Sequence, residues 1–284
     1  GKTAIDAVLF LLKNDVKPRR ISWIMPRDSW ILDRAQIQPT LESIGMALAN
    51  QIIPGSQSED IDDFFDKISK AGGLLRIDDN VKPTMYRCST VTKAELDQLK
   101  RVENIIRKGR VKSISDTEIV LEHGSIATNI ETLHVDCAGD GLAKRPPVPI
   151  FNDRKITLQS VRTCQQVFSA GLLGYVEANY KDDAKKNELC KPVPHPNTDM
   201  DFLRNNLADA INQESWIKEP GLKNWLQTSR LNFESHVLNA SPTIKILSAL
   251  SRLPFLRLFN KADKVQKKAT ENVRRLLDLQ ATSE

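Results

Sequence analysis

The sequence predicts an α/β protein in which a partial Rossmann-like domain precedes a helical C-terminal region. Three observations lead to this prediction. A short apolar helix at the N-terminus runs into a β-branched and aromatic strand at 21–25, and together they make half of a βαβ unit. Residues 102–128 hold short segments separated by turn residues, which is typical of an antiparallel meander. Beyond residue 156, helical periodicity dominates.

The first helix is expected to be buried. Ile5, Val8, Leu9 and Leu12 have the i, i+3, i+4, i+7 spacing of an apolar helix face, and Phe10 is expected to widen that face. Further helices are predicted at 40–49, 61–71 and 93–101, the last with a capping box formed by Thr92 and Glu95. The predicted strands of this half are 74–77, 102–106, 109–114, 118–121, 125–128 and 132–137.

Basic residues and prolines at 144–149 indicate a boundary. After it we expect a strand at 156–161 and a helix at 164–179, with Thr163 and Gln166 at capping-box spacing. The remaining predicted helices are 199–213, 221–235, 243–252 and 259–280.

Composition narrows the class of protein. The chain has 284 residues, of which 40% are hydrophobic and 27% charged, as in ordinary globular proteins. No apolar run approaches the roughly 18 residues of a membrane span. We see no secretory signal, and because Gly1 is not an initiator methionine we expect the chain to begin mid-protein. The net charge of +5 and the absence of zinc-finger, RRM or KH patterns do not suggest nucleic acid as a partner.

The four cysteines lie far apart and form no C-x-x-C pair. This spacing argues against a redox-active dithiol, a zinc cluster and a disulfide scaffold. We therefore expect a reducing, cytoplasmic location and no metal site.

The opening motif Gly1-Lys2-Thr3-Ala4 stands at the start of the first helix, where phosphate groups commonly bind. It is open to three interpretations. In a dinucleotide fingerprint, Gly1 lets the backbone approach a pyrophosphate and Ala4 is the small residue where helix meets strand. In a truncated P-loop, Lys2 contacts phosphates, Thr3 binds Mg²⁺ and Asp136 is the metal-side carboxylate. A helix that begins this way and binds nothing is the third.

The residues after the strand at 21–25 bear on the choice of cofactor. Arg27 suits the 2′-phosphate of NADP, because guanidinium groups pair bidentately with phosphate. Asp28 is the competing choice and would favour the 2′-OH of NAD. Asp6 is a candidate for cofactor contact or for simple stabilisation of the helix N-terminus, and Arg34 for phosphate binding or an exposed surface position.

Several segments resemble a bacterial family of FAD- and NAD(P)-dependent oxidoreductases related to flavin-containing monooxygenases and to two-dinucleotide-binding-domain flavoproteins. The resemblance runs from residue 1 to about residue 235. The segments that carry it are G-K-T-A-I-D-A at the N-terminus, I-S-W-I-M-P-R-D-S-W-I-L-D-R (21–34), L-H-V-D-C-A-G-D-G-L (133–142), R-T-C-Q-Q-V-F-S-A-G-L-L-G-Y-V-E-A (162–178) and P-V-P-H-P (192–196).

The resemblance implies a domain organisation. Residues 1–131 would be an NAD(P)-binding domain whose first strand and first glycine lie upstream. Residues 132–180 would cross over and return to an FAD-binding domain, and 181–284 would be a helical region. Ala138, Gly139 and Asp140 would correspond to the crossover, although this chain lacks the threonine of the family's A-T-G pattern. Gln159 and Arg162 would lie near the flavin.

These inferences predict an enzyme that passes hydride from NADPH or NADH to FAD and then to oxygen or a small organic substrate. The chain by itself is expected to be inactive, and the sequence identifies no catalytic acid or base. The alternatives are a P-loop nucleotide hydrolase and a non-catalytic nucleotide-binding module.

The basic, apolar-rich tail at 241–284 carries nine Lys/Arg against four Asp/Glu. It would suit contact with an anionic membrane, but a helix packed on its own domain is the favoured interpretation.

Overall fold

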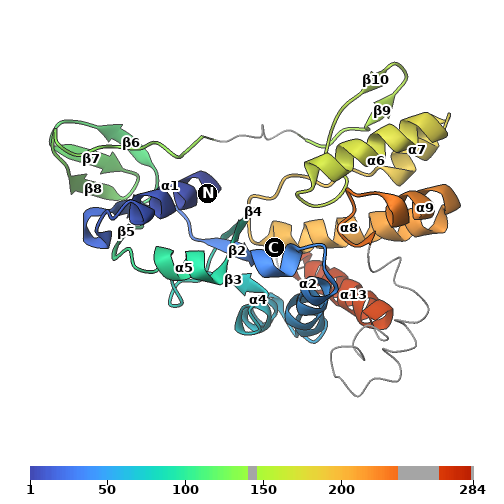
Figure 1. The fold of residues 1–284 in the computed structure, drawn as a ribbon, viewed down its shortest axis with the longest axis horizontal. Coiled ribbons are helices and arrows are strands. Elements are labelled where there is room, and N and C mark those ends of the chain that lie inside the picture. Colours follow the sequence, from blue (N-terminus) through green and yellow to red (C-terminus); the bar gives the residue numbers. More distant parts are fainter. Residues whose placement is uncertain (140–145, 236–261, 283–284) are drawn as a thin grey trace. The chain divides into compact units, whose positions relative to one another are not determined.

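The computed structural model describes residues 1–139, 146–235 and 262–282. The chain divides into two compact units. Figure 1 labels the main helices and strands along the chain. Unit 1 comprises Gly1–Leu32, Leu75–Ala143 and Asn197–Asp199, and unit 2 comprises Asp33–Leu74, Lys144–Pro196 and Met200–Glu284. Within the described residues the protein is a mixed α/β structure with parallel and antiparallel sheets.

In unit 1, helix α1 (Lys2–Lys13) is followed by the 3-10 turn η1 (Pro18–Arg20) and strand β1 (Ser22–Ile24). Strand β1 pairs in parallel with β5 (Asn104–Ile106). Ile5, Val8 and Leu12 of α1 are buried in one cluster with Trp23 of β1, so the predicted helix-to-strand unit is confirmed. Phe10 does not widen the buried face, because it lies 65% exposed.

A three-stranded sheet has the order β3-β2-β4. Its strands are β2 (Ser29–Asp33), β3 (Leu74–Leu75) and β4 (Met85–Val91). The sequence predicted only the region of β3. It did not predict β2, because two adjacent central residues of β2, Trp30 and Ile31, are both buried, and such a pattern lacks the alternation that identifies half-exposed strands.

Helix α5 (Lys93–Leu99) begins with the predicted capping box, in which Thr92 and Glu95 each bind the other's backbone nitrogen. The strands β6 (Val111–Ile114), β7 (Glu118–Leu121) and β8 (Gly124–Ala127) then form an antiparallel meander (Figure 1). The meander was predicted, but its supposed first strand was wrong, because β5 pairs with β1 instead.

The predicted strand at 132–137 is also wrong. This segment is irregular, and the apolar side chains of Leu133 and Val135 are 82% and 60% exposed. An extended segment is a strand only when a neighbouring strand accepts its hydrogen bonds. Among the described residues, 132–137 pairs with no other strand.

Unit 2 is mainly helical. Its elements are η2 (Arg34–Ile37), α2 (Leu41–Ala47), η3 (Leu48–Ile52), α3 (Ile53–Gly55), α4 (Ile61–Lys70), the hairpin of β9 (Phe151–Asn152) with β10 (Lys155–Ile156), α6 (Gln166–Asn179), α7 (Asp183–Leu189), α8 (Met200–Lys218), α9 (Pro220–Thr228) and α13 (Ala262–Ala281). A buried cluster that includes Phe168, Leu172, Trp216 and Leu222 joins α6, α8 and α9.

Most of the predicted helices of unit 2 are present, with differences in detail. The strand at 156–161 is wrong beyond Ile156, and the Thr163–Gln166 capping box does not form. Thr163 has a φ of +30°, and α6 begins without a side-chain cap. Helix α9 ends at Thr228 rather than at 235. Helix α7 was not predicted, and the predicted helix at 243–252 lies outside the described residues.

The helix α13 packs within unit 2. Ala269, Val273 and Leu276 are buried, and Asn272 donates to the carbonyl oxygens of Gly55 and Ser58 at 2.8 and 3.0 Å. This packing agrees with the favoured interpretation of the tail for the part that the structure describes. Over the described ranges, no helix combines the length and apolar character that a bilayer crossing requires.

Among the described residues, Cys137 and Cys190 carry free thiols. Burial raises the pKa of the Cys190 thiol to about 12, so this thiol is a packed apolar group rather than a nucleophile.

Candidate functional site: a cluster of arginines in unit 1

The N-terminus of α1 has the features of an anion site. Its first turn contains no acidic residue, and the first backbone N–H groups of any helix have no intrahelical partner. Ala4 packs against the apolar cluster under the helix.

Lys2 and Asp6, one helical turn apart, form an ion pair on the surface of α1. Both side chains are substantially exposed, at 38% and 59%. Exposed pairs of this spacing contribute only about 0.3–0.5 kcal/mol. Lys2 can therefore leave Asp6 for a ligand at a small cost in free energy. The contact with Lys2 also gives Asp6 a structural role on the helix surface.

Arg27, which follows β1, meets Arg87 of β4 at one oxygen atom. The side-chain oxygen of Asn197 accepts hydrogen bonds from Nη2 of Arg27 at 3.0 Å and from Nε and Nη2 of Arg87 at 3.2 and 2.6 Å. Two guanidinium cations are thus held within hydrogen-bonding distance of the same uncharged acceptor. All three residues are part-buried and belong to unit 1.

The electrostatics of this cluster are those of concentrated positive charge. Burial lowers the pKa of Arg27, and the positive charges of Arg87 and Arg110 lower it further, while Asp199 acts in the opposite direction. Arg87 therefore lies close enough to Arg27 to influence its charge. We call Arg27, Arg87 and Arg110 the arginine cluster.

Asp28, which follows Arg27 in the sequence, is not part of the arginine cluster. It is 8% exposed, and its carboxylate accepts two hydrogen bonds from Arg107, at 2.8 Å from Nε and 3.0 Å from Nη2. Arg107 also contacts Asp78 at 3.1 Å. The backbone carbonyl of Asp28 accepts from the amides of Thr84 and Met85, both at 3.2 Å. Asp28 is thus an internal structural residue.

The other residues singled out from the sequence do not join the arginine cluster within unit 1. Arg34 belongs to unit 2. Ala138 and Gly139 are exposed in an irregular segment, where the carboxylate of Asp136 accepts from the Ala138 amide at 2.8 Å, and Asp140 lies outside the described residues. Thr3 is exposed in the first turn of α1.

Gln159 and Arg162 belong to unit 2 and have internal partners there. The side chain of Gln159 bonds to both backbone groups of Val148, at 3.1 and 2.6 Å. Arg162 is 2% exposed, pairs with Glu234 at 2.7 Å and donates to Asn232 at 2.8 Å. Its guanidinium lies 4.8 Å from the ring centre of Phe168.

A second buried charge lies beside Arg162. Burial raises the pKa of Asp209 to about 6, against the lowering effect of Arg162, whose Nε is 3.9 Å away. This cluster is an internal support for the α8 region.

Sequence reasoning missed Arg87, Arg110 and Asn197. None of them lies in a motif, and Asn197 is 170 residues from Arg27 along the chain. The sequence contains one signal for Asn197, namely that the polar run Asn-Thr-Asp (197–199) directly follows P-V-P-H-P (192–196). That run returns to unit 1, while His195 stays in unit 2, where its ring contacts the carbonyl of Pro196 at 3.0 Å.

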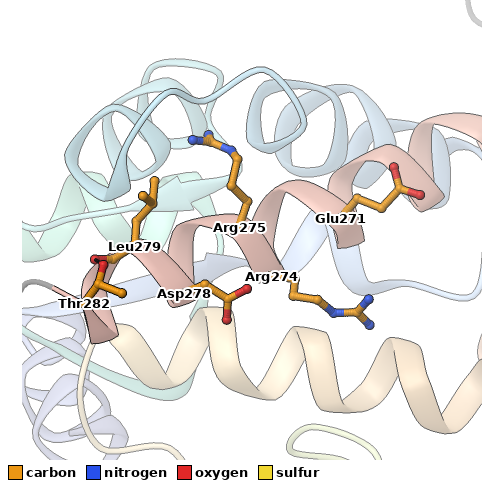
Figure 2. A pocket seen from close by; sticks show the side chains of 6 residues that line it. All are labelled: Glu271, Arg274, Arg275, Asp278, Leu279 and Thr282. Atoms are coloured by element: carbon orange, nitrogen blue, oxygen red, sulfur yellow. Dashed lines mark hydrogen bonds between the residues drawn. The ribbon is translucent and has the colours of Figure 1, made fainter.

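A surface hollow on α13 does not form a site. Figure 2 shows that its lining comes from one helix, with Arg274 and Arg275 pointing to opposite sides. Arg275 already donates to the carbonyl oxygens of Ser58 and Glu59. The lining residues are Glu271, Arg274, Arg275, Asp278, Leu279 and Thr282. Over the described ranges, no group of His, Cys, Asp and Glu residues is arranged to hold a metal ion.

Comparison with known proteins gives relatives without an assigned activity. The chain is 46% identical over 252 residues to the uncharacterized protein Rv2000 of Mycobacterium tuberculosis (strain ATCC 25618 / H37Rv), covering 84% of this chain and 45% of the relative. The uncharacterized protein Mb2023 of Mycobacterium bovis gives the same identity and coverage. The chain thus spans under half the length of these curated relatives. No family profile matches the chain, and no solved structure matches it.

Proposed function

We propose that this chain provides the NADPH-binding portion of a flavin-dependent, monooxygenase-like oxidoreductase. Bound NADPH would supply hydride, and a flavin would supply the chemistry that passes electrons to oxygen or to a small organic substrate. The observation that carries the NADPH part is the arginine cluster, in which Arg27 and Arg87 are joined at Asn197.

The chemistry of the cluster fits a phosphorylated dinucleotide. Guanidinium groups bind phosphate through paired N–H donors, and the N-terminus of a helix favours an anion. Arg27 and Arg87 would hold the 2′-phosphate, and the amides at the start of α1 would face the diphosphate. Arg110 is exposed, and its charge lowers the pKa of Arg27 by less than burial and Arg87 do. It would add attraction for the same anion.

The position of Asp28 supports NADP over NAD. An NAD site needs a carboxylate that accepts hydrogen bonds from the ribose hydroxyl groups. The Asp28 carboxylate is buried and bound at both oxygens by Arg107. Contact with a ribose would require breaking that pair, whereas Arg27 needs no such rearrangement.

The arrangement around β1 also favours the dinucleotide interpretation over the P-loop. Strand β5 is followed by the meander β6–β8, where a P-loop enzyme would continue its parallel strand–helix alternation. Asp136, the carboxylate that the P-loop interpretation requires at a strand end, lies in an irregular segment and binds the Ala138 amide.

The flavin part of the proposal rests on the sequence resemblance. Gln159 and Arg162, which the resemblance places near FAD, are bonded to Val148 and to the Asn232–Glu234 region. They do not fit a flavin in this arrangement. If FAD binds, other residues must hold it.

The test is a calorimetric titration of the purified protein with NADPH and with NADH. We expect tighter binding of NADPH, and the Arg27→Ala change should weaken NADPH binding by about 10–100-fold, because hydrogen bonds to charged groups contribute about 1.5–3 kcal/mol. NADH binding should change little. Arg20→Ala, at an exposed arginine of η1, is the matched control. A protein that binds neither nucleotide and is purified without flavin would refute the proposal.

A further inference from the structure

Asn197 occupies an unusual place in the fold. The three residues Asn197–Asp199 belong to unit 1, although Pro196 and Met200 on either side belong to unit 2. The amide of Asp199 donates to the carbonyl of Thr84 at 3.3 Å, which fixes this short segment beside the start of β4. The side-chain oxygen of Asn197 then accepts from both Arg27 and Arg87.

An amide oxygen at this point has a particular electrostatic effect. It has two lone pairs, so it can accept from two guanidinium groups at once, and it carries no net charge. A carboxylate at the same place would bind the two arginines more strongly but would cancel part of their charge. The amide therefore holds the two cations together without adding negative charge of its own to that of Asp199, which favours the charged form of Arg27.

We propose that Asn197 is the positioning residue of the arginine cluster, and that it sets the preference for a nucleotide carrying a 2′-phosphate. Its amide oxygen keeps the Arg27 and Arg87 guanidiniums side by side so that both bind the same phosphate monoester. This inference rests on the proposed function. It identifies the residue, distant in sequence, on which the discrimination between NADPH and NADH depends.

Two substitutions separate positioning from stability. Asn197→Ala removes the shared acceptor and leaves the two like charges to move apart. Asn197→Asp keeps the size and all three hydrogen bonds and adds a negative charge, so this variant should melt no lower than the parent protein. Loss of NADPH binding in Asn197→Asp therefore cannot be explained by unfolding.

The experiment titrates the parent, both variants and a control with NADPH and NADH, and records the melting temperature of each protein. We expect Asn197→Asp to weaken NADPH binding by at least about 10-fold, because a carboxylate competes with the phosphate for the same donors. Asn197→Ala should weaken it by about 3–10-fold, the effect of one or two lost hydrogen bonds. NADH binding should stay within about 2-fold, because NADH lacks the phosphate that these donors bind.

The control is Asn14→Ala, an exposed asparagine at the opposite end of α1 whose amide donates to the carbonyl of Phe10. A lower ratio of NADPH to NADH affinity in both Asn197 variants, with the control unchanged, supports the inference. An unchanged ratio in Asn197→Asp overturns it and leaves the proposed function standing. A parent protein that does not bind NADPH overturns the proposed function and, with it, this inference.

Discussion

The ion pair between Asp28 and Arg107 gives the sharpest test of how unit 1 is built. We consider Asp28→Asn, which preserves the shape of the side chain and one acceptor oxygen but removes the charge. The parent pair has two charge-assisted hydrogen bonds, at 2.8 and 3.0 Å, and Asp28 is 8% exposed. The hydrogen bonds from Thr84 and Met85 to the backbone of residue 28 remain in the variant.

The expected loss follows from the burial of the two partners. Breaking a fully buried pair costs about 3–5 kcal/mol. Here the Arg107 side chain is 30% exposed and keeps its contact with Asp78. Solvent screening and the retained acceptor reduce the loss, and we expect the free energy of unfolding to fall by about 2 kcal/mol.

The assay is urea denaturation followed by circular dichroism, with Asp116→Asn as the control. Asp116 is an exposed carboxylate in the turn between β6 and β7. The same proteins are titrated with NADPH and NADH. A loss below about 0.5 kcal/mol, the range of ordinary surface substitutions, would refute the structural role of the pair. A 10-fold or larger loss of NADH affinity, about 1.4 kcal/mol, would instead identify Asp28 as a ribose ligand.

Two further predictions concern pH and helix capping. Burial raises the folded-state pKa of Asp209 from 3.8 to about 6, so its protonated form stabilises the fold at low pH and that contribution is lost as the pH rises from about 4 to about 6. The amide side chain introduced by Asp209→Asn does not titrate, so the unfolding free energy of this variant, relative to the parent, should rise by about 2 kcal/mol between pH 4 and pH 7. Urea denaturation at both values checks this, and a constant difference would contradict it. The change Thr92→Ala removes the hydroxyl that accepts from the Glu95 amide at the start of α5, while the backbone N–H of residue 92 can still donate to the Glu95 carboxylate. This change should cost about 1 kcal/mol, measured as a lower urea midpoint; an unchanged midpoint would show that the Thr92 hydroxyl contributes nothing.

The sequence identified features whose causes are local. The α5 capping box depends on two residues three positions apart, and the periodicity of α1 lies within one short segment. The meander β6–β8 followed from short segments and turn residues such as Gly124, whose φ of +118° suits glycine. The sequence also identified Arg27 as a candidate phosphate ligand, because it follows the strand that comes after the first helix.

Features that depend on distant segments were not predictable in the same way. Strand β5 was assigned to the meander, because nothing within residues 102–106 shows that β1 is its partner. The segment 132–137 has the composition of a strand, but strand formation requires a neighbouring chain as well as a suitable sequence.

The candidate site shows the same division. By itself the sequence determined the helix that begins at Lys2, the strand that follows it and an arginine at the end of that strand. Only the tertiary structure decided that Asp28 is bound to Arg107 and that Arg27 meets Arg87 at Asn197. The physical reason is that hydrogen bonds and charge act through space, so partners 79 and 170 residues apart leave no periodic or local pattern in the chain.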